Sequence, residues 1–333
     1  MIPYSTLEEA HQRIHGVAIE TPLTRFRDNL LLKDESKQPI GAFKLRGAYN
    51  MVAQLTADQL QHGVITFSSG NHAQGVAYAA RALGAKAVIV MPSNSPQVKI
   101  DATRALGAEV VFVGPASLER KLKAEALARE HGYTIIPPYD DERIIAGQAT
   151  CGLEILKQLG WNEQSRSEDA LILSPVSGGG LLSGVSTGIK QMCAARQWQA
   201  PPVWGVEPEL AADAAESFRT RTLVEWPAEK TTRTLADGLR TQSLGQKNFE
   251  HILRFTDGIV TVSEAELRLA LGRILRETSI VAEPSGAVTL AAALFHGSQL
   301  PTARRIVAIV SGGNIDPQLR AEILAEPATP TTV

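Results

Sequence analysis

Three short apolar runs, far apart in the chain, each end in a loop of Ser, Gly and Asn. VITF at 64–67 leads into SSGNH, LILSPV at 171–176 leads into SGGG, and RIVAIV at 305–310 leads into SGGN. Two more apolar runs, AVIVM at 87–91 and VVFV at 110–113, also alternate with amphipathic stretches of helical length. This alternation predicts an α/β fold with open, mostly parallel, twisted sheets covered by helices.

The shared position of the three loops predicts one common crevice. In open α/β sheets, ligands bind beyond the carboxyl ends of the strands, where Gly lets the backbone approach and Ser or Asn offers hydrogen bonds. The loop at 177–180 runs directly into the helical pattern LLSGVSTGIKQM, so its N–H groups and a helix N-terminus would suit a phosphate. A Gly triplet alone is more often a tight packing turn, and the GxxxxGK[ST] and GxGxxG nucleotide patterns are missing.

The length of the chain indicates two domains, because 333 residues exceed what one simple core usually holds. Residues 54–140 contain their own set of predicted strands and helices, and we interpret them as a smaller, substrate-gripping domain inserted into a larger one formed by 1–53 and 141–326. The segment 220–246 has few apolar runs and is typical of a long irregular segment near a site or an interface. Residues 327–333 are expected to form a disordered tail.

Composition narrows the function classes. The formal net charge is -2 and no run of Lys or Arg stands out, which argues against nucleic acid and leaves a small molecule as the expected ligand. No signal-peptide pattern opens the chain, and no apolar run approaches the ~18 residues of a membrane span, so we expect a cytoplasmic protein without membrane contact. Cys151 and Cys193 lack disulfide-framework or zinc-ligand spacing and are expected in the core.

Lys44 lies in the segment GAFKLRGA at 41–48. By itself a Lys beside Phe and Arg is usually a surface residue. Together with the three loops, however, the chain resembles the fold type II (tryptophan synthase β-like) pyridoxal phosphate (PLP) enzymes, and within them the serine/threonine dehydratase and serine racemase family. The resemblance covers nearly the whole chain and runs in order through TPL, GAFKLRGA, SSGNHAQG, PVSGGGL, GVEP, TLADGLR, EPSG and SGGN.

The resemblance implies the catalytic and cofactor-binding residues. Lys44 matches the lysine that holds the cofactor and moves the α-proton on one face, and Ser69 matches the proton carrier that racemases use on the opposite face. Asn71 matches the residue that binds the cofactor's phenolic oxygen, and Ser177 stands where many relatives have the first Gly of the phosphate loop. The implied cofactor-binding positions are Phe43, Lys44, Asn71, Ser177, Gly178, Gly179, Gly180, Leu181, Glu283 and Ser311.

Two of these positions have a plain structural alternative. Ser311 resembles the residue at the pyridine nitrogen, where a neutral hydroxyl makes the ring a weaker electron sink than an Asp would, which favours rapid elimination. Without the resemblance, Ser311 is typical of a turn before two glycines. Glu283, in AEPSG, is either an acid near the cofactor or a residue at the start of a helix.

The substrate-binding positions follow from the same resemblance. Ser68, Ser69, Asn71 and His72 match the loop that grips the substrate carboxylate, a use that suits N–H and hydroxyl donors. A structural histidine remains the alternative for His72. Arg120 and Thr241 align with substrate-contacting residues of serine racemase. Arg120 lies in the helical pattern SLERKLKAEALARE, where an exposed charge is the default.

Glu207, Ala211 and Asp213 match a divalent-cation site of the related racemases and dehydratases. In that pattern a Glu, the backbone carbonyl four residues on, and an acid two residues further bind the metal. Two carboxylates in a turn are otherwise usually solvated. Oxygen ligands of this kind suit Mg²⁺, Mn²⁺ or Ca²⁺, and the expected role is to order the domain rather than to react.

The resemblance therefore implies a PLP-dependent carbon–oxygen lyase. We expect a dehydratase, or ammonia-lyase, that converts a β-hydroxy amino acid of the L-threonine, L-serine or 3-hydroxyaspartate type to a 2-oxo acid and ammonia. The alternative is a PLP-dependent serine or aspartate racemase that uses Lys44 and Ser69, and a remote alternative is a catalytically silent PLP-fold regulator. The expected partners are a small amino acid substrate and a second copy of the chain in a homodimer.

Overall fold

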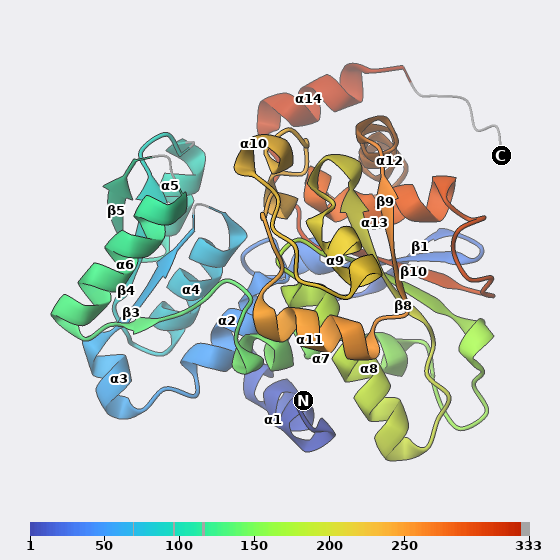
Figure 1. Ribbon diagram of the computed structural model, residues 1–333, viewed down its shortest axis with the longest axis horizontal. Helices are drawn as coiled ribbons and strands as arrows, with labels where there is room; N and C mark the ends of the chain where they lie inside the picture. Colours follow the sequence, from blue (N-terminus) through green and yellow to red (C-terminus); the bar gives the residue numbers. More distant parts are fainter. Residues whose placement is uncertain (69, 96, 115–116, 328–333) are drawn as a thin grey trace.

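The computed structural model describes residues 1–68, 70–95, 97–114 and 117–327. The described part of the chain contains two separate β-sheets, each covered by helices (Figure 1). The predicted α/β class with two mostly parallel sheets is therefore confirmed.

The larger sheet has six strands in the order β1-β2-β10-β7-β8-β9. Strands β1 and β2 pair in an antiparallel manner, and all other neighbours are parallel. Strand β10, from the end of the chain, lies between β2 and β7, so the two predicted loops after β7 and β10 leave neighbouring strands at the same edge. The strands are β1 Leu23–Arg27, β2 Leu30–Asp34, β7 Leu171–Pro175, β8 Val203–Pro208, β9 Gly258–Val262 and β10 Ile306–Val310.

The smaller sheet has four parallel strands in the order β5-β4-β3-β6. They are β3 Val64–Phe67, β4 Ala87–Pro92, β5 Glu109–Val113 and β6 Thr134–Ile135. All four lie within the predicted inserted domain, 54–140, and every strand of the larger sheet lies outside it. The exact division at 53/54 and 140/141 stays a prediction.

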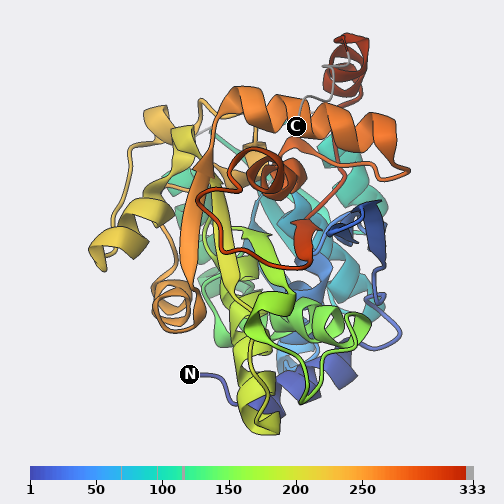
Figure 2. The same cartoon turned by 90° about the vertical axis from the view of Figure 1, so that its right-hand side faces the viewer.

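Helices cover both sheets and join them. They are α1 Tyr4–Ile14, α2 Lys44–Val52, α3 Ala57–His62, α4 Asn71–Ala82, α5 Gln97–Ala105, α6 Ser117–His131, α7 Glu142–Gln158, α8 Gly180–Arg196, α9 Asp213–Thr220, α10 Ala228–Thr231, α11 Gln246–Phe255, α12 Glu264–Glu277, α13 Pro284–Phe295 and α14 Pro317–Ala325. Short 3₁₀ turns are η1 Glu35–Lys37, η2 Ser167–Asp169, η3 Glu209–Ala211 and η4 Asp237–Leu239. Figures 1 and 2 show α1 and α14 at opposite ends of the molecule. Within the described ranges, no helix is both long and apolar enough to cross a bilayer.

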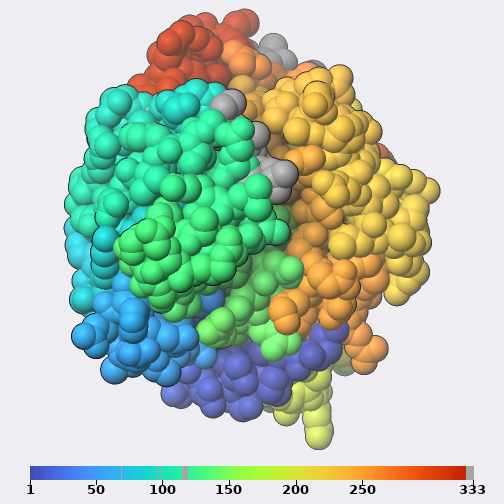
Figure 3. Space-filling model, turned by 60° about the vertical axis from the view of Figure 1, so that its left-hand side comes forward, coloured from blue at the N-terminus to red at the C-terminus, as the bar shows by residue number. Residues whose placement is uncertain are grey.

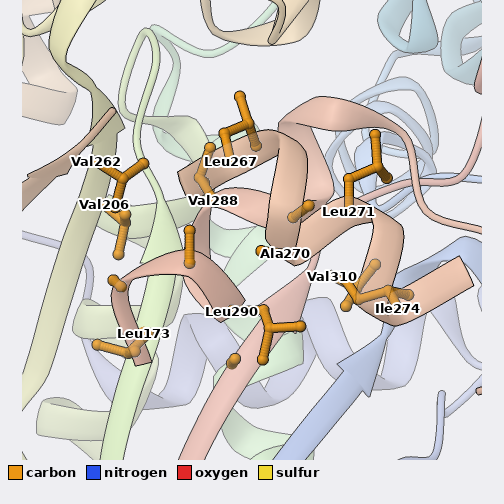
Figure 4. Close-up of a cluster of buried hydrophobic side chains, with 14 of the residues drawn as sticks. Leu173, Val206, Val262, Leu267, Ala270, Leu271, Ile274, Val288, Leu290 and Val310 are labelled. Atoms are coloured by element: carbon orange, nitrogen blue, oxygen red, sulfur yellow. The ribbon is translucent and has the colours of Figure 1, made fainter. Parts of the chain in front are cut away.

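The core follows the alternation of side chains along each buried strand. Leu171 and Leu173 of β7 pack with α12 and α13 on one face of the larger sheet, whereas Ile172 packs with α8 on the other. Figure 4 shows the first of these clusters, in which Leu173 and Val206 face helix residues such as Leu271. Because both faces are covered by helices, these strands read as continuous apolar runs rather than alternating ones.

Helix α2 connects the two units and packs tightly against α7. A Cβ on Gly147 would lie 2.6 Å from the backbone of both Arg46 and Gly47, so only Gly permits this approach of the two helix backbones. On its other side, α2 places Ala48 and Met51 in the core of the smaller sheet. Residues at the start of α2 are therefore fixed relative to both sheets.

Candidate active site

A cavity of about 560 Å³ brings the three loops together. Figure 3 shows a groove between the cyan-to-green unit of the smaller sheet and the yellow-to-orange part of the larger one. The single crevice expected from the three strand ends is thus present. Predicted site residues on its wall are Phe43, Lys44, Ser68, Asn71, His72, Arg120, Ser177, Gly178, Gly180, Leu181, Thr241, Glu283 and Ser311.

Lys44 is the first residue of α2, and its amine points into this cavity. Its Nζ donates to the carbonyl of Pro138 at 2.9 Å and lies 5.1 Å from the centre of the Phe43 ring. The backbone N–H of Phe43 donates to the Ser311 carbonyl at 3.0 Å, which ties the start of α2 to the loop after β10. Burial lowers the pKa of Lys44 to about 8, so near neutral pH a useful fraction of the amine is uncharged and nucleophilic.

The loop between β7 and α8 turns sharply before the helix begins. Ser177 has a φ of 57° and Gly179 has a φ of 90°. The left-handed conformation is unfavourable for Ser, but its hydroxyl donates to the Gly238 carbonyl at 3.1 Å and lies 3.3 Å from the Thr241 hydroxyl. These contacts hold a Ser where the family pattern often has Gly. Gly179 faces the protein interior, since a Cβ there would lie 2.8 Å from Leu244.

The glycines on either side of Gly179 leave space beside Tyr139. A Cβ on Gly178 would lie 2.5 Å from the Tyr139 ring, and one on Gly180 would lie 2.9 Å from the Tyr139 Cβ. The two glycines therefore let Tyr139 pack directly on this backbone, and both also line the cavity at the helix N-terminus. Successive N–H groups at a helix start bind anions well, so the loop has the chemistry for a phosphate.

Asn71, at the start of α4, is held from two sides. Its Nδ2 donates to Glu283 Oε1 at 2.7 Å, and its Oδ1 accepts from Asn314 Nδ2 at 2.8 Å. Glu283 occupies the N-cap position of α13, but its carboxylate turns to Asn71, so its position fits both alternatives left open by the sequence. Burial and the nearby charge of Asp237 raise the pKa of Glu283 to about 7.

His72 lines the cavity but is also a buried structural residue. Its Nε2 lies 3.0 Å from the Ile136 carbonyl, an acceptor, so Nε2 carries the hydrogen. Burial, with a smaller effect from the Lys44 charge, lowers the pKa of His72 to about 3. The ring is therefore neutral at physiological pH and is not a proton donor of the imidazolium type.

Ser311, Arg120 and Thr241 complete the wall from different elements. Ser311 is only 4% exposed, and its hydroxyl lies at the outer limit of hydrogen bonding, 3.5 Å, from the Ser285 carbonyl. Arg120 comes from α6, where burial lowers its pKa. Ser69, the predicted proton carrier on the second face, lies outside the described residues.

Sequence reasoning missed three residues on the same wall. Lys99 of α5 donates to Asp237 at 2.8 Å, an ion pair that crosses from the smaller to the larger unit. Tyr139 packs against Gly178 and Gly180 in the loop between β7 and α8, as described above. Asp237 lay in the TLADGLR segment, which could have signalled a role, whereas Lys99 and Tyr139 reach the cavity only through the tertiary fold.

The predicted metal ligands lie outside this cavity wall and are buried together at the end of β8. Glu207 is the last residue but one of β8, Ala211 lies in the 3₁₀ turn that follows, and Asp213 begins α9. Glu207 Oε2 accepts from the Ala215 N–H at 2.8 Å. Glu207 Oε1 and both carboxylate oxygens of Asp213 are buried without a hydrogen-bond partner among the described residues.

Three buried carboxylate oxygens without a donor fit a cation. Burial raises the pKa of both acids, and for Glu207 the charge of Asp213 adds to this effect. Orphaned acceptors of this kind need either protons or a positive ion. In the described ranges no cluster of three or more His, Cys, Asp and Glu forms, so backbone carbonyls such as that of Ala211 would have to complete the coordination.

A cluster of buried charges lies beneath α2. Arg46 is fully buried and makes paired hydrogen bonds to Glu35, at 2.7 and 2.8 Å, and to Glu154, at 2.6 and 2.8 Å. Lys33 donates to Glu154 at 2.7 Å and to the Thr21 carbonyl at 2.7 Å. Two cations and two anions thus balance one another and fix the helix that begins with the cavity lysine.

Comparisons with known proteins found similar sequences and similar structures. The family model described as "Pyridoxal-phosphate dependent enzyme" matches residues 15–312. An L-threo-3-hydroxyaspartate ammonia-lyase of Saccharomyces cerevisiae is 36% identical over 97% of this chain and 96% of its own, and a serine racemase of Schizosaccharomyces pombe is 38% identical over 97% of both. Among solved structures, a threonine deaminase from T.th. has a TM-score of 0.85 and 42% identity, covering 95% of this chain and 99% of that one.

Proposed function

Because the chain belongs to the family of pyridoxal-phosphate dependent enzymes, we propose that it is a PLP-dependent carbon–oxygen lyase. It converts a β-hydroxy amino acid of the L-threonine, L-serine or 3-hydroxyaspartate type to a 2-oxo acid and ammonia. The observation that carries the proposal is the Lys44 amine, with its lowered pKa, inside a cavity walled by the three loops. The ammonia-lyase and the threonine deaminase among its relatives support this reaction class.

The residues on the cavity wall fit PLP. Lys44 is the amine that would hold the cofactor aldehyde, with Phe43 packed beside it. The loop at 177–181 would hold the phosphate through its N–H groups, and Asn71 and Ser311 would meet the phenolic oxygen and the ring nitrogen. When bound, PLP supplies the electron sink that makes the α-proton of the substrate acidic. Glu283 accepts a hydrogen bond from Asn71 and so helps to hold it in place.

The remaining chemistry belongs to the chain's own groups. The hydroxyls of Ser68 and Ser69, with the backbone N–H groups of Asn71 and His72, would grip the substrate carboxylate and set its orientation over the cofactor. The Lys44 amine would take the α-proton on one face, and the β-hydroxyl would take up a proton and leave as water. Arg120 and Thr241 contact the distal part of the substrate. A neutral Ser311 hydroxyl at the ring nitrogen favours rapid elimination.

A divalent cation is part of the proposal. Glu207, Asp213 and the carbonyl of Ala211 would hold Mg²⁺, Mn²⁺ or Ca²⁺, which would supply the positive charge that the two buried carboxylates need. Its role is to order the turn between β8 and α9. The protein is further proposed to act as a homodimer in the cytoplasm, in amino acid catabolism, with the domain division given above.

Ammonia and 2-oxo acid release by the purified protein, with PLP and Mg²⁺, tests the reaction. L-serine, L-threonine, 3-hydroxyaspartate and phenylserine are compared as substrates, and one of them should give strong release. Lys44→Ala should abolish it, while Lys37→Ala, which removes an exposed lysine seven residues earlier, should not. Full activity of Lys44→Ala, or a protein without cofactor absorbance, would refute the proposal.

Racemisation of serine or aspartate is the second candidate, supported by the similarity to a serine racemase. It would use Lys44 on one face and Ser69 on the other. D-amino acid formation that is lost in Ser69→Ala, with ammonia release retained, would identify it. A catalytically silent regulator would bind PLP but release no product from any of these amino acids.

A further inference from the structure

We propose that Asn314 is a positioning residue that fixes the amide orientation of Asn71, so that the nitrogen of Asn71 faces Glu283 and the cofactor position. Asn314 is the last residue of the SGGN segment, whose first residue, Ser311, lines the cavity. It lies behind Asn71, outside the cavity lining that the described residues form. The inference rests on the proposed function, because it concerns a group that would touch bound PLP.

The orientation can be traced from a backbone carbonyl, which can only accept a hydrogen bond. Asn314 Nδ2 donates to the carbonyl of Ile40 at 2.9 Å. The same Nδ2 is 2.8 Å from the Asn71 side chain. Because an amide nitrogen only donates, the Asn71 atom that faces Asn314 must be its oxygen. The Asn71 nitrogen is thereby turned to the opposite side.

On that opposite side the Asn71 nitrogen meets an acceptor and the cavity. Its Nδ2 donates one hydrogen to Glu283 Oε1 at 2.7 Å. An amide nitrogen carries two hydrogens, so the second remains for an oxygen placed in the cavity. A flipped amide would instead point Oδ1 at that oxygen, which is unfavourable, and would deprive Glu283 Oε1 of the hydrogen bond from Asn71.

Asn314 can impose this orientation because it is held in place itself. A Cβ on Gly41, whose φ is +71°, would lie 2.5 Å from Asn314 Oδ1, so the amide packs directly on bare backbone. The Gly313 N–H donates to the Gly41 carbonyl at 2.9 Å and ties the two loops together. Both hydrogens of Asn314 Nδ2 are used, one on Ile40 and one on Asn71.

Asn314→Asp is the sharpest test, because it keeps the shape of the side chain and replaces the donor by an acceptor. The aspartate would repel Asn71 Oδ1 and so favour the flipped amide. PLP affinity, measured by absorbance titration without substrate, should fall by about tenfold or more, as expected for a hydrogen bond to a charged group. The pH midpoint of the cofactor's absorbance change should rise, because the deprotonated phenolic oxygen loses its donor.

Two further variants separate positioning from simple stability. Asn314→Ala frees the Asn71 amide to rotate. It should change the PLP affinity and the pH midpoint in the same direction as Asn314→Asp, but by a smaller amount. Asn162→Asp, the same exchange at an exposed site outside the cavity lining, should leave both unchanged. If Asn314→Asp does not fold by circular dichroism, Asn314→Ala decides the question.

Wild-type spectrum and affinity in the Asn314 variants would overturn the inference, even if their melting temperature falls. In that outcome the wild type still binds PLP, so the proposed function stands and Asn314 only ties two loops together. A wild-type protein that binds no PLP would overturn both the inference and the proposed function.

Discussion

Replacing Arg46 with Met should destabilise the protein strongly although Arg46 lies outside the cavity lining. The guanidinium is fully buried between Glu35 and Glu154, with two hydrogen bonds to each. Its loss leaves two buried carboxylates with one cation, Lys33, and takes the cluster from neutral to one negative charge. Removing one partner of a buried ion pair typically costs about 3–5 kcal/mol.

The buried cluster also makes stability depend on pH. Burial acts to raise the pKa of Glu35, but the charge and hydrogen bonds of Arg46 outweigh it and hold the pKa well below the usual carboxyl range. In the wild type the Glu35 carboxylate therefore stabilises the fold at neutral pH, and this contribution is lost only as the pH falls toward the lowered pKa. Without Arg46, burial raises the pKa of Glu35 and its carboxylate protonates readily, so the deficit of Arg46→Met should shrink as the pH falls from 7 toward 4.

Equilibrium unfolding in urea, at neutral pH and near the carboxyl range, measures both effects. Arg304→Met is the matched control, since Arg304 is 76% exposed and pairs with Asp169, and such surface pairs contribute at most about 1 kcal/mol. A loss of free energy of unfolding no larger in Arg46→Met than in the control, or a deficit that does not change with pH, would show that the cluster does not stabilise the fold in this way.

Three further outcomes are expected. The rate of PLP uptake by cofactor-free protein should rise with pH and level off above about 8, because only the neutral Lys44 amine attacks the aldehyde, and a flat stopped-flow profile would contradict this. Gly178→Ala should weaken PLP binding by a clash with the Tyr139 ring, and adding Tyr139→Ala should restore part of the affinity; an equally weak double variant in the titration would speak against the packing argument. Mg²⁺ at 100 times its dissociation constant should add about 2.7 kcal/mol to the free energy of unfolding, and the Glu207→Gln, Asp213→Asn double variant should gain nothing. An equal melting temperature of the wild type with and without Mg²⁺ would contradict the proposed cation at Glu207 and Asp213.

Local sequence patterns predicted the strands and the loops that follow them. The apolar runs at 64–67, 87–91, 110–113, 171–176 and 305–310 all coincide with strands, because covered parallel strands are apolar on both faces. The loops after three of them meet in one cavity, as their strand-end positions predicted. The order of the sheet, with β10 between β2 and β7, depends on contacts between distant segments and could not be predicted locally.

Long-range contacts also explain what the sequence concealed at the site. Glu35, Arg46 and Glu154 are charged residues, which are mostly exposed, and only the packing of α2 on α7 and η1 shows that they neutralise one another inside the protein. Ser177 stood out as a departure from the family pattern, but its left-handed conformation and its contact with Gly238 become visible only in three dimensions. The segment 220–246, expected near a site or an interface, contributes to the cavity wall.

Reductive trapping tests directly whether the cofactor is held on Lys44, on which the proposed function depends. The purified protein is loaded with PLP, treated with borohydride and digested, and the peptide masses are measured by mass spectrometry. A phosphopyridoxyl group is expected on the peptide that contains Lys44, and the other peptides should be unmodified. Trapping on another lysine, or none in a protein that still releases ammonia from a β-hydroxy amino acid, would contradict the role of Lys44.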